Sequence, residues 1–129
     1  ARALAERLRQ LGVSNDVTKL LDFLSRAIGG EEVMKQAKEI IVTPESSVAL
    51  NELKKAAEAL KDWQGEITFD LTEIDEMEYY TGIMFTFFSP KLKSELGRGG
   101  RYDGVLAHFG APMPAVGFSF SMEELARLI

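Results

Sequence analysis

Three segments in the second half of the chain carry the residue types that can do chemistry. They are YYTG from Tyr79, GRGGRYDG over 97–104 and PAVGF over 114–118. A tyrosine hydroxyl both donates and accepts hydrogen bonds, an arginine binds carboxylates with two parallel hydrogen bonds, and glycine lets the backbone approach a ligand closely. These segments can therefore bind a small polar molecule.

Each of these residues also has a purely structural interpretation. Tyr79 and Tyr80 are adjacent, so in a strand they point to opposite faces and only one can line a given site; both can also be core aromatics. The glycine-rich run can simply be a turn. Arg101 can anchor a ligand carboxylate or pair with Asp103, and we favour the pairing.

Other classes of chemistry lack their residues in this sequence. There is no cysteine, and His108 is the one histidine, so we expect no metal site. No phosphate-binding P-loop or dinucleotide-binding glycine motif is present, and we expect no cofactor. A net charge of −5 over 129 residues, without a basic stripe, argues against broad nucleic-acid binding, and we expect no bound tRNA.

The elements that must position these residues divide into a helical half and a strand-rich half. Apolar residues recur at helical spacing in the first half, from Val17 to Ile28 in one continuous stripe. Gly12, Gly29-Gly30 and Gly65 are placed to end helices; either Ser14 or Asn15 is placed to begin one, and Thr43 another. The predicted helices run from Leu4 to Leu11, Val17 to Ile28, Glu31 to Ile41 and Pro44 to Trp63, with Leu50, Leu53, Ala57 and Leu60 as the buried stripe of the last.

From Ile67 the apolar period changes from helical to alternating. Ile67, Phe69 and Leu71 alternate with polar residues, and Tyr79–Phe88 is aromatic on both faces, which predicts a central strand. We expect an irregular turn over 97–100, a helix over 102–109, a strand over 115–121 and a helix over 122–129. The order predicts an α+β fold with a mostly antiparallel sheet, divided into domains 1–66 and 67–129.

Taken in order, YYTGIMF, GRGGRYDGVLAHFG and PAVGFSFSMEEL resemble the histidyl-tRNA synthetase family, which has the class II synthetase fold. The resemblance is strong over 79–125 and loose over the helices. It implies a helical insertion segment, 1–66, followed by the C-terminal part of a class II synthetase-like catalytic domain, 67–129. The sheet would be mostly antiparallel and flanked by helices. It also implies that this chain is the closing part of a larger domain.

The same resemblance implies a histidine pocket. The second tyrosine of the family's pair faces the amino acid, so Tyr80 is the first candidate and Tyr102 the second. The residues that the resemblance assigns to the pocket are Tyr79, Tyr80, Gly99, Gly100, Arg101, Tyr102 and Gly117.

Two positions depart from the family in charge. An arginine that helps to activate the histidine carboxylate precedes the double tyrosine in that family, and Asp75 stands there in this chain. An arginine of the last helix grips the ATP phosphates in the family, and Glu124 stands there. Developing negative charge on a phosphate needs positive neighbours, so we expect these two catalytic positions to be lost and the chain not to be an enzyme.

A scaffold that keeps its motifs and loses these arginines resembles the regulatory subunit of ATP phosphoribosyltransferase. That resemblance implies a role in histidine biosynthesis, the catalytic phosphoribosyltransferase subunit as partner, and L-histidine as feedback ligand. Two alternatives stay open: a histidyl-tRNA synthetase, and a ligand-free interaction module. We also expect self-association through an open sheet edge, a cytoplasmic location, and no membrane segment.

Overall fold

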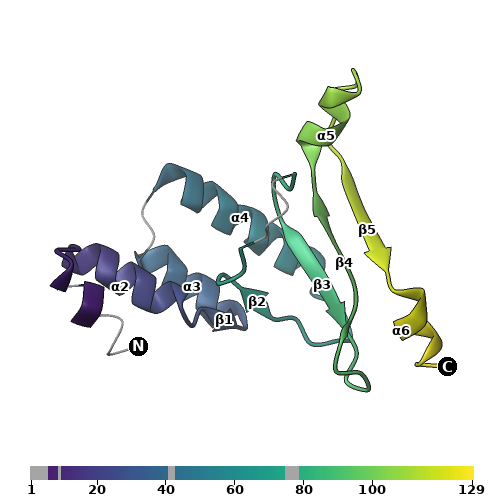
Figure 1. Cartoon of the computed structure of the whole chain (residues 1–129), viewed down its shortest axis with the longest axis horizontal. Helices are drawn as coiled ribbons and strands as arrows, with labels where there is room; N and C mark the ends of the chain where they lie inside the picture. The colour runs from purple at the N-terminus through teal and green to yellow at the C-terminus, as the bar shows by residue number, and fades with distance from the viewer. Residues whose placement is uncertain (1–5, 9, 41–42, 75–78) are drawn as a thin grey trace. The chain divides into compact units, whose positions relative to one another are not determined.

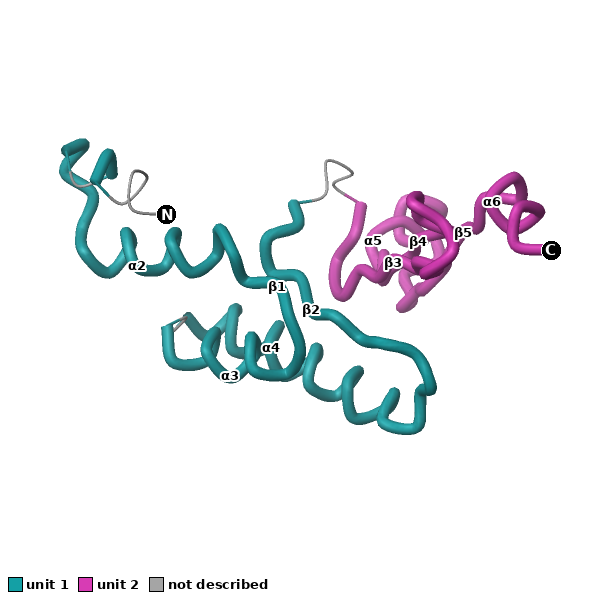
Figure 2. The backbone as a smooth tube through the Cα atoms, turned by 90° about the horizontal axis from the view of Figure 1, so that it is seen from below, with its two compact units in different colours: residues 1–74 teal, residues 75–129 magenta. Residues whose placement is uncertain are grey.

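The computed structural model describes residues 6–8, 10–40, 43–74 and 79–129. The chain divides into two compact units, Ala1–Ile74 and Asp75–Ile129, which Figure 2 shows in different colours. The first unit is mainly helical and the second contains a three-stranded sheet. In the described part of the chain, no helix is long and apolar enough to cross a membrane.

The helices of the first unit begin where the sequence places their caps. Helix α2, Asn15–Leu24, starts after Ser14, whose Oγ accepts a hydrogen bond from the Val17 amide at 3.3 Å. Helix α3 spans Glu31–Ile40, and helix α4, Pro44–Ala59, starts after Thr43 with proline at its first position. These three starting points are confirmed, and Figure 1 shows α2, α3 and α4 in chain order.

The predicted continuous stripe on α2 is wrong beyond Leu24. The helix ends there, and Ile28–Gly29 forms strand β1, which pairs antiparallel with strand β2, Phe69–Asp70. The Leu71 amide also donates to the Ala27 carbonyl at 2.9 Å. Backbone pairing with a segment far along the chain therefore outweighs helical spacing, and the Ile28 side chain stays 53% exposed.

A small core holds the first unit together. Phe23, Ala27, Val33 and Ala37 are buried against one another, and Leu24, Leu50 and Leu71 pack on them. Phe69 is also buried, so the alternation predicted from Ile67 is confirmed in its inward face. Because β2 pairs with β1, residues 67–74 group with the helical unit.

Some residues of the predicted apolar stripes are exposed in the structure. Val17 and Leu21 of α2 are exposed, although both belong to the predicted stripe. Helix α4 ends at Ala59 rather than at Trp63, and Leu60, its predicted last buried residue, is exposed. The core needs only one side of each helix, and Val17, Leu21 and Leu60 keep 38–45% of their surface exposed.

The second unit is an antiparallel sheet with two short helices. Strands β3, Met84–Phe88, β4, Glu95–Arg101, and β5, Val116–Phe120, lie in the order β3-β4-β5. Helix α5, Asp103–His108, connects β4 to β5, and helix α6, Met122–Ala126, follows β5. Figure 1 shows β4 between β3 and β5, and the predicted α+β class with antiparallel pairing is confirmed.

Two sequence predictions for this sheet are wrong. The run 97–100 is not a turn but the middle of β4, the central strand, whereas the aromatic segment predicted to be central forms the edge strand β3. The glycines are required by close packing: a methyl group at Gly99 would lie 2.7 Å from both Phe118 Cβ and Phe85 Cζ. Glycine-rich sequence marks a crowded strand here, not a bend.

The strand register gives the sheet two different faces. Phe85 pairs with Gly99 and Gly99 with Phe118, while Phe87 and Phe120 stand on either side of Gly97. Residues directly opposite one another in antiparallel strands share a face, so this is a phenylalanine face. Its rings touch along the sheet, with centroids 5.4 Å apart for Phe85 and Phe87 and 5.2 Å for Phe87 and Phe120.

The other face carries glycines and polar residues beside one methionine. Met84, Gly100 and Gly117 form one row across the three strands, and Thr86, Arg98 and Ser119 form the next. This face carries the candidate site.

Candidate functional site

Three tyrosines from two segments meet at the glycine row. The rings of Tyr79 and Tyr80 lie 4.3 Å apart between centroids and are tilted by 38°. The ring of Tyr102 meets Tyr79 edge-on, with centroids 6.1 Å apart. Tyr79 and Tyr80 lead toward β3 and Tyr102 follows β4, so the strand pairing brings the two segments together.

Glycines lie under these rings, and a side chain at either glycine would clash with the ring above it. A methyl group at Gly100 would lie 2.7 Å from Tyr80 Cε1, and one at Gly117 would lie 3.1 Å from Tyr102 Cε1 and closer still to its hydroxyl. Tyr80 and Tyr102 therefore lie on the face to which Gly100 and Gly117 would point their side chains. The sheet supplies a glycine floor beneath two phenol rings.

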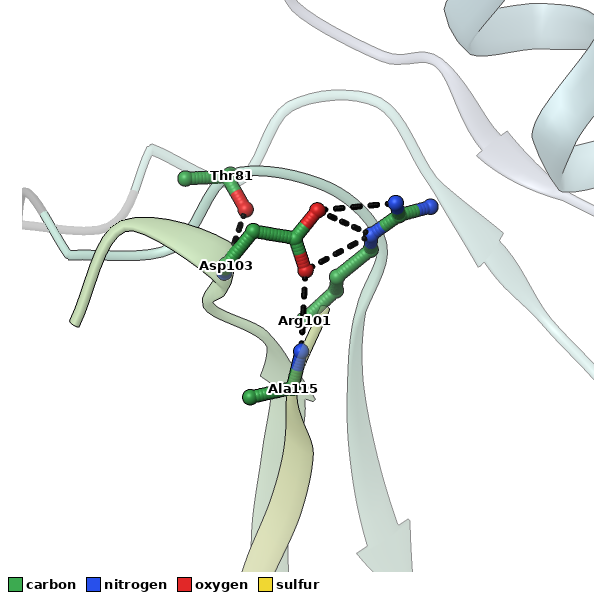
Figure 3. Close-up of polar contacts among 4 residues, drawn as sticks. All are labelled: Thr81, Arg101, Asp103 and Ala115. Carbon is green, nitrogen blue, oxygen red and sulfur yellow. Dashed lines mark hydrogen bonds and ion pairs between the residues drawn. The ribbon is translucent and has the colours of Figure 1, made fainter. Parts of the chain in front are cut away.

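Asp103 forms a carboxylate clamp with Arg101, Thr81 and Ala115, as Figure 3 shows, and it directly follows Tyr102 in the chain. Arg101 Nε donates to both oxygens of Asp103, at 3.0 and 2.8 Å, and Arg101 Nη2 lies 2.8 Å from Asp103 Oδ2. The Ala115 amide donates to Asp103 Oδ1 at 3.0 Å, and the Asp103 amide donates to Thr81 Oγ1 at 3.0 Å. Residues on both sides of Tyr102 are thus tied to the segments before β3 and before β5.

The clamp keeps Asp103 ionised. The hydrogen bonds from Arg101, and then that from the Ala115 amide, lower the pKa of Asp103 below its ordinary value of 3.8. Of the two interpretations of Arg101, the structure shows the pairing with Asp103.

The structure brings together five of the predicted site residues, namely Tyr79, Tyr80, Gly100, Tyr102 and Gly117. Gly99 does not join them, because its neighbours are Phe85 and Phe118 on the opposite face. Asp75, the first of the two predicted lost catalytic positions, lies outside the described residues.

Glu124, the second such position, lies in the first turn of α6. Its Oε1 accepts a hydrogen bond from Arg127 Nη1 at 2.8 Å, and Arg127 also binds Glu123 at 2.6 Å. The Glu124 side chain is only 14% exposed, and its Oε2 is buried without a hydrogen-bond partner among the described residues. This turn therefore holds two carboxylates, those of Glu123 and Glu124, and both bind Arg127.

Sequence reasoning missed one charged residue on the tyrosine face. Arg98 precedes Gly100 by two positions on β4, so the two residues point to the same side of the sheet. It forms a two-bond fork with Glu95, from Nε to Oε1 at 3.0 Å and from Nη2 to Oε2 at 2.6 Å. The alternation of side chains along a strand would have placed Arg98 on this face. The sequence predicted a turn at 97–100, and a turn has no alternating faces.

The lone histidine has a local partner. His108 Nδ1 lies 2.9 Å from the Gly104 carbonyl oxygen, one turn earlier in α5. Among the residues that the structure describes, no three histidine, aspartate or glutamate side chains gather to hold a metal ion.

An antiparallel sheet that carries YYTG, GGRYD and PAVGF on adjacent segments is the arrangement of a class II synthetase-like domain. The model of the histidyl-tRNA synthetase family matches residues 1–125. The chain therefore belongs to the histidyl-tRNA synthetase family, as its motifs predicted.

Two curated relatives carry a more specific name than the family model does. The chain is 42% identical over 127 residues to an ATP phosphoribosyltransferase regulatory subunit of Bacillus pumilus, covering 96% of this chain and 32% of the relative. It is 39% identical over 124 residues to a protein of the same name from a Thermoanaerobacter species, covering 95% and 33%. The chain spans about a third of the length of these curated relatives.

A solved structure shares the fold. The crystal structure of an ATP phosphoribosyltransferase regulatory subunit/histidyl-tRNA synthetase from Bacillus halodurans matches with a TM-score of 0.82 and 32% sequence identity. The match covers 95% of this chain and 33% of that one. The helices and the sheet described above therefore have the same fold as part of that solved structure.

Proposed function

We propose that this chain is part of a non-catalytic regulatory subunit of ATP phosphoribosyltransferase. Such a subunit would bind the catalytic phosphoribosyltransferase chain, activate the first step of histidine biosynthesis and transmit feedback inhibition by L-histidine. The observation that carries the proposal is the 42% identity, along nearly the whole chain, to a relative with that name.

The charges of Asp75 and Glu124, the two positions at which this chain departs from the family, support a non-catalytic role. A synthetase must stabilise negative charge on the ATP phosphates, and the family does so with arginines. A carboxylate about 4 Å from a phosphate repels it by roughly 1–4 kcal/mol, depending on the local dielectric. Glu124 and Asp75 would oppose adenylation in this way.

The tyrosine face supplies what a histidine-binding site needs. An imidazole can stack on an aromatic ring and can hydrogen-bond a phenol hydroxyl. Tyr80 and Tyr102 offer both interactions, and the missing side chains of Gly100 and Gly117 let the two rings lie close to the sheet. We assign these four residues to histidine binding and Tyr79 to supporting both rings.

Reconstitution tests the proposal. The catalytic phosphoribosyltransferase subunit is assayed alone and with the full-length protein, and we expect activity to depend on the added protein. A matched control is the full-length protein heated until it unfolds. Equal activity with and without the folded protein would exclude the regulatory role.

A histidyl-tRNA synthetase is the second candidate, because the family model carries that description. It requires histidine-dependent exchange between ATP and pyrophosphate by the full-length protein. We expect no exchange above a reaction without histidine. Exchange at the rate of a family synthetase would favour this candidate over the regulatory subunit.

A further inference from the structure

No further inference is drawn: the strongest candidate, the exposed part of the phenylalanine face along β5, where Phe118 and Phe120 keep 67% and 39% of their surface exposed, carries nothing because nothing in the structure shows what covers it.

Discussion

At the scale of single residues, the glycines of the sheet matter as much as the side chains beside them. Gly99 lets two phenylalanines approach on one face, and Gly100 and Gly117 let two tyrosines approach on the other. The same strand thus serves packing on one side and the candidate site on the other. A side chain at any of these positions must displace a ring.

Gly100→Ala tests the glycine floor. Its new methyl group would lie 2.7 Å from the Tyr80 ring, so we expect a loss of about 1–3 kcal/mol in the free energy of unfolding. Histidine affinity, measured by calorimetry on the full-length protein, should fall with it.

Gly104→Ala is the matched control, because a methyl group there meets only Thr81 Cγ2, at 4.0 Å. Position 104 is helical, where alanine is favoured over glycine by about 1 kcal/mol. We expect unchanged or higher stability. Equal losses in the two variants would contradict the role of the floor.

Asp103→Asn tests the clamp around Tyr102. The folded-state pKa of Asp103 is lowered, so the clamp stabilises the fold above the unfolded value near 3.8 and this contribution is lost as pH falls through the folded pKa. Urea unfolding at pH 6 should show the variant destabilised, and the difference should shrink as the pH falls below the ordinary pKa of 3.8.

Asp22→Asn provides the comparison for Asp103→Asn. Asp22 also pairs with an arginine at 2.8 Å, but the pair joins residues only four apart in the chain, whereas Asp103 also accepts from the distant Ala115 amide. Such exposed pairs contribute about 0.2–1 kcal/mol, so we expect a small effect. A difference between Asp103→Asn and wild type that stays constant from pH 6 to pH 2 would contradict the clamp.

At the scale of elements, the helix starts and the strand at Val116–Phe120 could be predicted from the sequence, but the pairing and order of the strands could not. Ser14 and Thr43 act through hydrogen bonds to amides three residues away, which is local information. The end of α2 depends on β1 pairing with Phe69–Asp70, and the central place of β4 depends on contacts with Phe85 and Phe118. Composition alone therefore predicted a turn at 97–100.

The candidate site, too, could be predicted from the sequence only in part. The tyrosines and Gly100 and Gly117 were identified from motifs and lie together. Gly99 was placed in the same site, but strand alternation puts it on the other face. Arg98 was missed because its place on the tyrosine face follows only from the register of β4 with its neighbours.

Thr43→Ala tests the local information at the start of α4. Thr43 Oγ1 accepts a hydrogen bond from the Ser46 amide at 3.2 Å, and removal of such a cap costs about 1 kcal/mol in unfolding free energy. Thr43→Ser keeps the hydroxyl and should lose less. Denaturant unfolding of both variants makes the comparison, and equal stability of Thr43→Ala and wild type would contradict the capping role.

At the scale of the whole molecule, the sheet has two edges. Within the described residues, β3 and β5 each pair with β4 alone, and an edge strand can pair with another chain. We propose self-association of this chain through an edge. Sedimentation of the isolated chain should show a dimer at high concentration, and Phe118→Pro, which removes an amide from the side of β5 that faces away from β4, should weaken it. A monomer at every concentration would contradict the proposal.

The regulatory role is tested most directly by titrating the catalytic phosphoribosyltransferase subunit with the full-length protein and then with L-histidine. The account predicts that activity rises to a plateau at a fixed ratio of the two proteins. Histidine should then inhibit the complex, and Gly100→Ala should require more histidine for the same inhibition. Activity that ignores the added protein, or histidine inhibition of the catalytic subunit alone to the same extent, would contradict it.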